Sequence, residues 1–155
     1  MKKKAILFII TITILSLACK KNFYEKYYSF KNNVWDYHDT AIFKVHISPE
    51  DTSDLNIYFN IRHHTLYPYK NLWLFVNISG PENISETDTI NIFLADDKGN
   101  FKGEGLGDIW DYKYLFRNNV KFKLPGDYTF KITHGMRDAD KIPVMELGLI
   151  IEKNN

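Results

Sequence analysis

Alternation of apolar and polar residues along most of the chain limits its possible folds more than any other feature. Hydrophobic side chains take every second position in three separate segments: Ala41, Phe43, Val45 and Ile47; Leu55, Ile57, Phe59 and Ile61; and Tyr128, Phe130 and Ile132. A period of two places these side chains on one face of a β-strand. Turn-forming residues at 48–51 and 125–127 separate such segments. The pattern predicts a single all-β domain over residues 31–155, an antiparallel, jelly-roll-like β-sandwich.

Three segments depart from this simple alternation. Residues 72–78 are apolar at both strand phases, which predicts a central strand covered on both faces. Residues 90–95 form a shorter apolar run that predicts another strand. Within 112–119 we expect one short helical turn.

The N-terminal residues have the pattern of a lipoprotein signal peptide. Lys2, Lys3 and Lys4 precede a short apolar run, and Leu15-Ser16-Leu17-Ala18-Cys19 resembles a bacterial lipobox in which a small residue comes just before the cysteine. We therefore expect residues 1–18 to be removed, Cys19 to carry the lipid, and residues 19–30 to form a tether that becomes a first strand. By analogy with lipoprotein sorting in other envelopes, Lys20 favours the outer membrane, and the lack of an acidic run after it favours the periplasmic face.

Composition argues against several function classes. The net charge is +1 and the only lysine run lies at the N-terminus, so we expect no nucleic-acid partner. The one cysteine of the chain excludes an internal disulfide and a cysteine-based zinc cluster. We interpret the five histidines as scattered surface residues, and we expect no metal and no cofactor. Because no serine-nucleophile motif or zinc-protease motif is present, we expect no enzymatic activity.

The most distinctive segment is 103–111, in which three alternating glycines lead into an aromatic residue between acids. We interpret Asp108, Trp110 and Asp111 as candidate residues for recognising a partner; a structural loop and a hydrolase that uses the two aspartates are the alternatives. Tyr67 and Tyr69, which flank Pro68, are candidates for packing at a sheet edge or for ligand contact. Asp96, Asp97 and Asn100 could bind calcium, but a hairpin turn explains them adequately.

These segments together resemble the gliding-motility lipoprotein GldH family. The resemblance rests on Tyr67-Pro68-Tyr69-Lys70-Asn71-Leu72-Trp73-Leu74-Phe75, on Asp88-Thr89-Ile90 and Leu94-Ala95-Asp96, on 103–111, on Gly126-Asp127-Tyr128 with Met136-Arg137, and on Gly148-Leu149-Ile150-Ile151-Glu152-Lys153. It implies a cell-envelope lipoprotein needed for gliding, whose partners are the membrane and components of the gliding machinery and its coupled protein-secretion system. It implies no catalytic residues, and it gives only Cys19 a definite role, as the acylated anchor.

Two further interpretations remain open. A carbohydrate-binding sandwich would use Trp35, Trp110, Tyr67 and Tyr69 as aromatic platforms; its small-molecule ligand would be unknown. Thr40 and Thr89 lie in Asp-Thr-apolar sequences that fit a pattern of O-glycosylation on exported proteins, although chance also explains so short a pattern.

Overall fold

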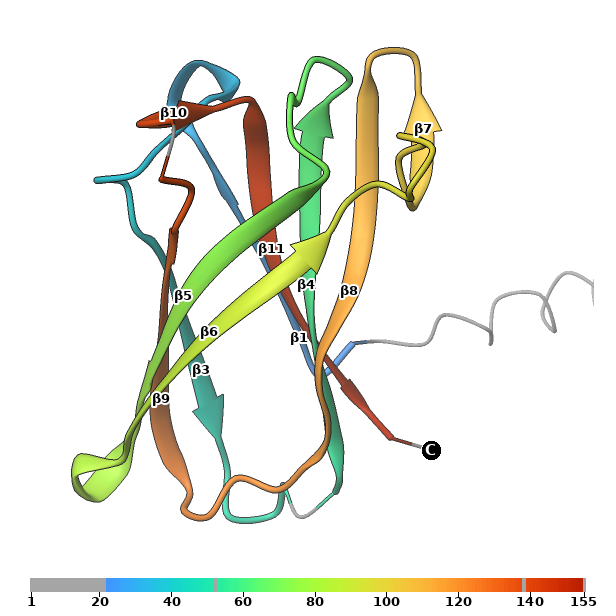
Figure 1. Cartoon of the computed structure of the whole chain (residues 1–155). Coiled ribbons are helices and arrows are strands. Elements are labelled where there is room, and N and C mark those ends of the chain that lie inside the picture. The colour runs from blue at the N-terminus through green and yellow to red at the C-terminus, as the bar shows by residue number, and fades with distance from the viewer. Residues whose placement is uncertain (1–21, 52, 138, 155) are drawn as a thin grey trace, which may run out of the picture.

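The computed structural model describes residues 22–51, 53–137 and 139–154, and these residues fold into two packed antiparallel sheets (Figure 1). The strands are β1 (Tyr24–Ser29), β2 (Trp35–Asp36), β3 (Ala41–Ile47), β4 (Leu55–His64), β5 (Asn71–Ser79), β6 (Ser85–Phe93), β7 (Glu104–Leu106), β8 (Ile109–Val120), β9 (Gly126–His134), β10 (Lys141–Ile142) and β11 (Val144–Lys153), with 3-10 turns at Lys31–Asn33 and Pro81–Asn83. The predicted sandwich is confirmed.

The strand order is that of a jelly roll. One sheet has the order β1-β11-β4-β8-β7 and the other β3-β9-β5-β6, while β2 and β10 form a small separate pair. When the short strands β2, β7 and β10 are left out, four strands remain in each sheet. The first strand, β1, lies beside the last, β11, and each sheet contains strands from both halves of the chain, as two Greek keys require.

The alternating segments form the core as predicted. In β3 and β4 the odd-numbered residues are buried and the even-numbered ones are not, and Phe59, Ile61, Phe130 and Ile132 are fully buried between the sheets. At one side of the sandwich Arg117, in the part of β8 beyond its short pairing with β7, joins β8 to the edge strand β6, since it bonds to Glu86 at 2.8 Å and also to Asp88. The hydrophobic layer therefore accounts for the fold, with an ion-pair bridge at its open side.

Several expectations about individual strands were wrong. Residues 112–119 are not helical, since all of them lie in β8. The strand predicted at 90–95 begins five residues earlier, at Ser85. The strand at 72–78 is central in its sheet but is covered on one face only, because Trp73 and Phe75 are exposed while Leu72, Leu74 and Val76 are buried. In the part of the chain that the structure describes, no further layer packs on the outer face of this sheet.

The first strand begins before residue 31. Tyr24–Ser29 pairs with β11 along its whole length, from Tyr24 opposite Ile151 to Ser29 opposite Glu146. The segment expected as tether therefore contains an edge strand, and the sheet begins at Tyr24. Residues 1–21, which include the expected signal peptide and Cys19, lie outside the described part of the chain.

Candidate functional site

Two chain turns lie side by side at one end of the sandwich and form what we call the tip, residues 65–67 and 104–110. The amide of Thr65 donates to the carbonyl of Asp108 at 2.9 Å, which joins the turn after β4 to the β7–β8 hairpin. Leu66 is 75% exposed and Leu106 is 87% exposed, the largest values among the exposed large hydrophobic residues. β7 marks this end at the top of Figure 1.

The glycines of 103–111 let the hairpin pack closely. Gly103 has φ +90, and a Cβ there would lie 2.1 Å from the carbonyl oxygen of Asp111. A Cβ on Gly105 would lie 2.8 Å from the indole ring of Trp110. Positive φ and close backbone approach are the conditions that favour glycine. The glycines therefore serve the hairpin's shape, which places Leu106 and Asp108 at its tip.

An aromatic cluster packs beneath the tip. It brings Trp110 of the segment 103–111 together with Tyr67 and Tyr69, which the sequence alone presents as separate candidates. Ring centroids are 5.8 Å apart for Trp110 and Phe101, 4.7 Å for Phe101 and His63, 5.4 Å for His63 and Tyr67, and 5.8 Å for Tyr67 and Tyr69. Tyr67 is buried, its hydroxyl donates to the carbonyl of Asn71 at 2.9 Å, and burial raises its pKa. Trp110 and Tyr67 thus act as packing anchors.

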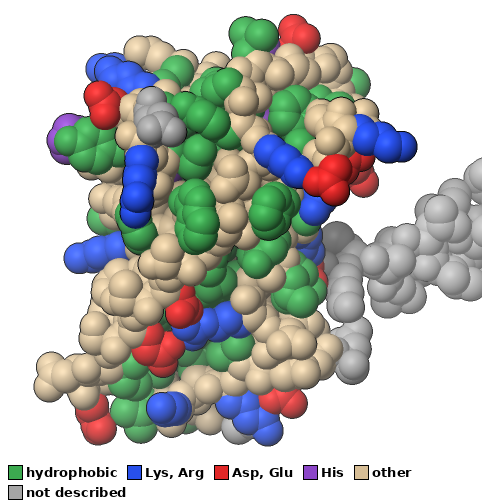
Figure 2. Space-filling model, in the orientation of Figure 1, with side chains coloured by type: hydrophobic (Ala, Val, Ile, Leu, Met, Phe, Trp, Pro, Cys, Tyr) green, Lys and Arg blue, Asp and Glu red, His purple; other side chains and the backbone are tan. Residues whose placement is uncertain are grey.

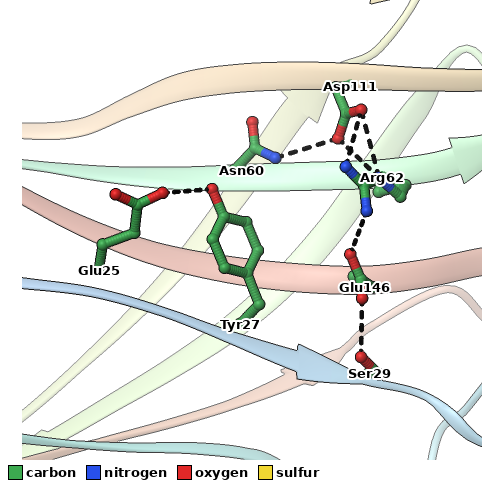
Figure 3. Close-up of polar contacts among 7 residues, drawn as sticks. All are labelled: Glu25, Tyr27, Ser29, Asn60, Arg62, Asp111 and Glu146. Atoms are coloured by element: carbon green, nitrogen blue, oxygen red, sulfur yellow. Dashed lines mark hydrogen bonds and ion pairs between the residues drawn. The ribbon is translucent and has the colours of Figure 1, made fainter. Parts of the chain in front are cut away.

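Asp111 belongs instead to a polar row across the outer face of the five-stranded sheet (Figure 3). Arg62 lies directly opposite both Asp111 and Glu146 in the strand register. Its Nε donates to Asp111 at 3.0 Å, its Nη1 donates to Glu146 at 2.6 Å, and Glu146 accepts from Ser29 at 2.7 Å. The hydrogen bond to Asp111 raises the pKa of Arg62. The guanidinium therefore neutralises two neighbouring carboxylates.

A second row lies beside the first. The hydroxyl of Tyr27 donates to Glu25 at 2.8 Å, and burial followed by this bond raises the pKa of Tyr27 to about 12. Gly148, opposite Tyr27 in the register, leaves room for the ring: a Cβ there would be 2.6 Å from it. The outer face of this sheet is thus a dense polar surface.

Replacing Arg62 by methionine should lower the free energy of unfolding by about 1 kcal/mol, because Asp111 and Glu146 then repel each other without a cation between them. The side chains are half-exposed, which keeps the effect small. Urea unfolding of the variant should show the loss, and it should grow as salt is removed. Lys121→Met, which removes a longer and more exposed ion pair to Asp54, is the control; an equal loss in both variants would contradict the special role of Arg62.

The alternative catalytic and metal interpretations gain no geometric support. Asp111 is bonded to Arg62 and to Asn60 at 3.2 Å, while Asp108 is exposed in the hairpin turn. Asp96 accepts from the amides of Lys98 and Asn100 at 2.9 and 2.8 Å, which is the hydrogen bonding of a turn. The side-chain amide of Asn100 also donates to Asp96, at 2.9 Å. This bond, followed by the backbone bonds, lowers the pKa of Asp96. In the described residues no group of three His, Cys, Asp or Glu could hold a metal.

Other predicted residues are spread over the molecule. Trp35 is fully buried, so it cannot be the sugar platform of the carbohydrate hypothesis. Tyr69 is half-buried and reaches a groove on the other sheet. Thr40 is partly exposed before β3, and Thr89 is exposed in β6.

Two buried histidines were missed, and the interpretation of all five as surface residues is wrong. His63 and His134 are in the core, and the Nε2 atom of each is buried without a hydrogen-bond partner in the described structure. Both follow the apolar phase of their strands, His63 after Ile61 and His134 after Ile132. That phase was visible in the sequence and could have predicted their burial.

Comparison with known proteins identifies the family. The model of the GldH lipoprotein family matches residues 22–151. The gliding motility lipoprotein GldH of Flavobacterium johnsoniae is 31% identical over 134 residues, covering 86% of this chain and 82% of the relative. A homolog from Christiangramia forsetii is 30% identical over 157 residues, covering 96% and 94%. No solved structure matches. In the described residues no helix is long and apolar enough to cross a bilayer. The family match spans most of the chain and all the principal strands, so the chain belongs to the GldH lipoprotein family.

Proposed function

We propose that the chain is a non-catalytic accessory of the gliding machinery and its coupled protein-secretion system, held in the outer membrane by lipid on Cys19 and facing the periplasm. Membership of a lipoprotein family and relatives named for gliding motility support the motility role. Several acyl chains on one cysteine give stable anchoring. The exposed tip is the surface through which the domain would reach its partners.

The observation that carries this proposal is the position of the tip relative to the anchored end. β1 starts at Tyr24, opposite Ile151, and Ile151 is opposite Ile57 near the start of β4. The tip follows His64, at the other end of β4. A strand of ten residues is about 33 Å long at about 3.3 Å per residue. Leu66 and Leu106 would therefore project away from the membrane. Exposed leucines in that position are available to bind another protein.

Spreading of colonies of the native strain tests the proposal. Deletion of the gene should abolish spreading. In the Leu66→Ser, Leu106→Ser double variant the distance that the colony edge advances should fall at least tenfold, although the protein is present in the membrane fraction. Ile42→Thr, which changes an exposed residue of β3, is the matched control and should spread normally.

The anchor is tested separately. Cys19→Ala should leave protein in the cell but detach it from membranes and stop spreading. A deletion strain that still glides would overturn the motility role, and a gliding Cys19→Ala strain would overturn the role of the lipid. If the tip variant spreads as well as the Ile42→Thr control, the tip is not the partner surface.

A further inference from the structure

A groove of about 520 Å³ lies on the outer face of the four-stranded sheet, on the other side of the sandwich from the polar rows. Its wall includes Tyr69, Asn71, Trp73, Phe75, Met136 and Arg137. Trp73 is 39% exposed and Phe75 is 47% exposed, two large aromatic side chains that the fold leaves outside its core. Hydrophobic side chains gather over the β5–β6 part of the molecule, with charged side chains around them (Figure 2).

The aromatic floor of the groove is held in place by the backbone. Trp73 and Phe75 are two residues apart in β5 and therefore share a face. The segment after β9 is fastened to this strand, since the amide of Gly135 donates to the carbonyl of Trp73 at 2.7 Å and the amide of Trp73 donates to Sδ of Met136 at 3.4 Å. The ring of Phe75 lies over Gly135, where a Cβ would be 2.7 Å from it. A fixed floor lowers the entropy cost of ligand binding.

Polar groups line the same groove. Nδ2 of Asn71 donates to Oδ1 of Asn91 at 2.6 Å, which fixes both amides and leaves the other amide atom of each side chain able to bond outward. Thr89, directly opposite Phe75 in the register, adds a hydroxyl. Among the described residues of the lining, Arg137 is the one charged side chain and none carries a carboxylate.

We propose that this groove binds a saccharide that carries a carboxylate. A pyranose ring has an apolar C–H face that fits an exposed aromatic ring, and hydroxyl groups at its edge that need amide and hydroxyl partners. The Arg137 guanidinium supplies the planar fork that matches a carboxylate. A wholly apolar ligand would leave the amides and the guanidinium without partners, which costs affinity.

The charge of the lining selects the acidic class of sugar. Because the described lining offers the Arg137 guanidinium and no carboxylate, an anionic sugar gains an ion pair there that a neutral sugar cannot make. The proposal does not depend on the motility role. The groove comes near the tip at Tyr69, whose ring meets that of Tyr67, but neither Leu66 nor Leu106 is in its described lining, so either proposal can fail while the other stands.

Calorimetric titration of the full-length acylated protein in detergent micelles tests the proposal. The probes are a panel of carboxylated oligosaccharides, namely oligogalacturonate, oligomannuronate, hyaluronan fragments and muramic-acid-containing glycan, each beside its methyl ester, which keeps the sugar and removes the charge. We expect at least one acid to bind, its ester to bind at least tenfold more weakly, and the indole fluorescence to change.

Variants assign the binding to the groove. Arg137→Gln changes an exposed side chain and should weaken binding of the acid by at least tenfold without changing binding of the ester. Trp73→Ala should weaken both at least tenfold, and thermal melting checks that it remains folded. Tyr37→Ala removes a similarly exposed aromatic side chain (46%) outside the groove and should have no effect. Failure of every acid to bind, equal binding of acids and esters, or binding unaffected by Arg137→Gln would each overturn the proposal.

Discussion

Replacing Trp35 by alanine is expected to lower the free energy of unfolding by about 3–5 kcal/mol, the cost typical of removing a large aromatic side chain from a core. Trp35 has no solvent-exposed surface. Its ring stacks on Phe30 with centroids 4.3 Å apart and meets His134 edge-on at 5.5 Å. Chemical denaturation of the wild type and the variant measures the loss directly.

A hydrogen bond adds to the packing around Trp35. Its indole N–H donates to the carbonyl of Asp39 at 2.8 Å, so the truncated side chain leaves a part-buried acceptor without its donor as well as a cavity. Trp35→Phe keeps much of the volume but loses this bond, and should fall between the wild type and the alanine variant.

The control for Trp35 is the same substitution at Trp73, whose ring is partly exposed. Trp73→Ala removes less buried surface and should cost about 1 kcal/mol. If both alanine variants lost the same stability, or if Trp35→Ala lost less than Trp73→Ala, burial would not be the reason why Trp35 matters.

The prediction of strands succeeded where each strand separates an apolar from a polar face. The segments 41–47 and 55–61 alternate cleanly because one face meets the other sheet and one meets water. Residues 72–78 misled the prediction because Trp73 and Phe75 put apolar side chains on the water face. Asn71 and Asn77, which share the phase of Trp73, were the available sign that this face is not buried.

The wrong helical turn at 112–119 has a different cause. Phe116 faces the core and stacks on Phe59 at 4.8 Å, whereas Leu115 on the other face is exposed. The register between β4 and β8 shifts between Leu55 and Ile57 and again between Ile57 and Tyr58. Irregular pairing of this kind breaks the period-two pattern over a short segment, so the sequence there does not reveal a strand.

The polar row of the candidate site could not be predicted from local sequence. Arg62 and Asp111 are separated by 49 positions and Arg62 and Glu146 by 84. Only the pairing of β4 with both β8 and β11 places the three side chains side by side. The segment 103–111 could be recognised as unusual, but the division of its residues among packing, ion pairing and exposure depends on strands far away in the chain.

Acid should destabilise the protein through its two buried histidines. Burial lowers the pKa of His63 and of His134 below the ordinary value of 6.5, since it disfavours the charged imidazolium. The nearby carboxylates, Asp111 for His63 and Asp36 and Asp140 for His134, act in the opposite direction without outweighing it. The unfolded chain therefore binds protons that the folded chain does not.

This difference in proton binding sets the direction of the stability change and the pH range in which it occurs. Well above the ordinary histidine pKa of 6.5 both states hold neutral imidazoles and the stability is complete. As the pH falls below the ordinary histidine pKa, the free energy of unfolding should fall, by at most about 1.4 kcal/mol per pH unit for each histidine, until the folded protein also takes up the protons. Urea unfolding measured between about pH 8 and pH 5 at constant ionic strength gives the slope, in a window around the histidine pKa.

Substitution of the two histidines distinguishes their contribution to acid destabilisation from that of the carboxylates, which also take up protons in acid. The His63→Phe, His134→Phe double variant keeps two rings in the core and has no imidazole there to titrate, so its stability should change much less between pH 6.5 and about pH 5. Phe101→Leu is the matched control: it removes the ring that contacts His63, lowers stability at every pH, and should keep the wild-type slope. A double variant that loses stability in acid as steeply as the wild type would show that other groups control the effect.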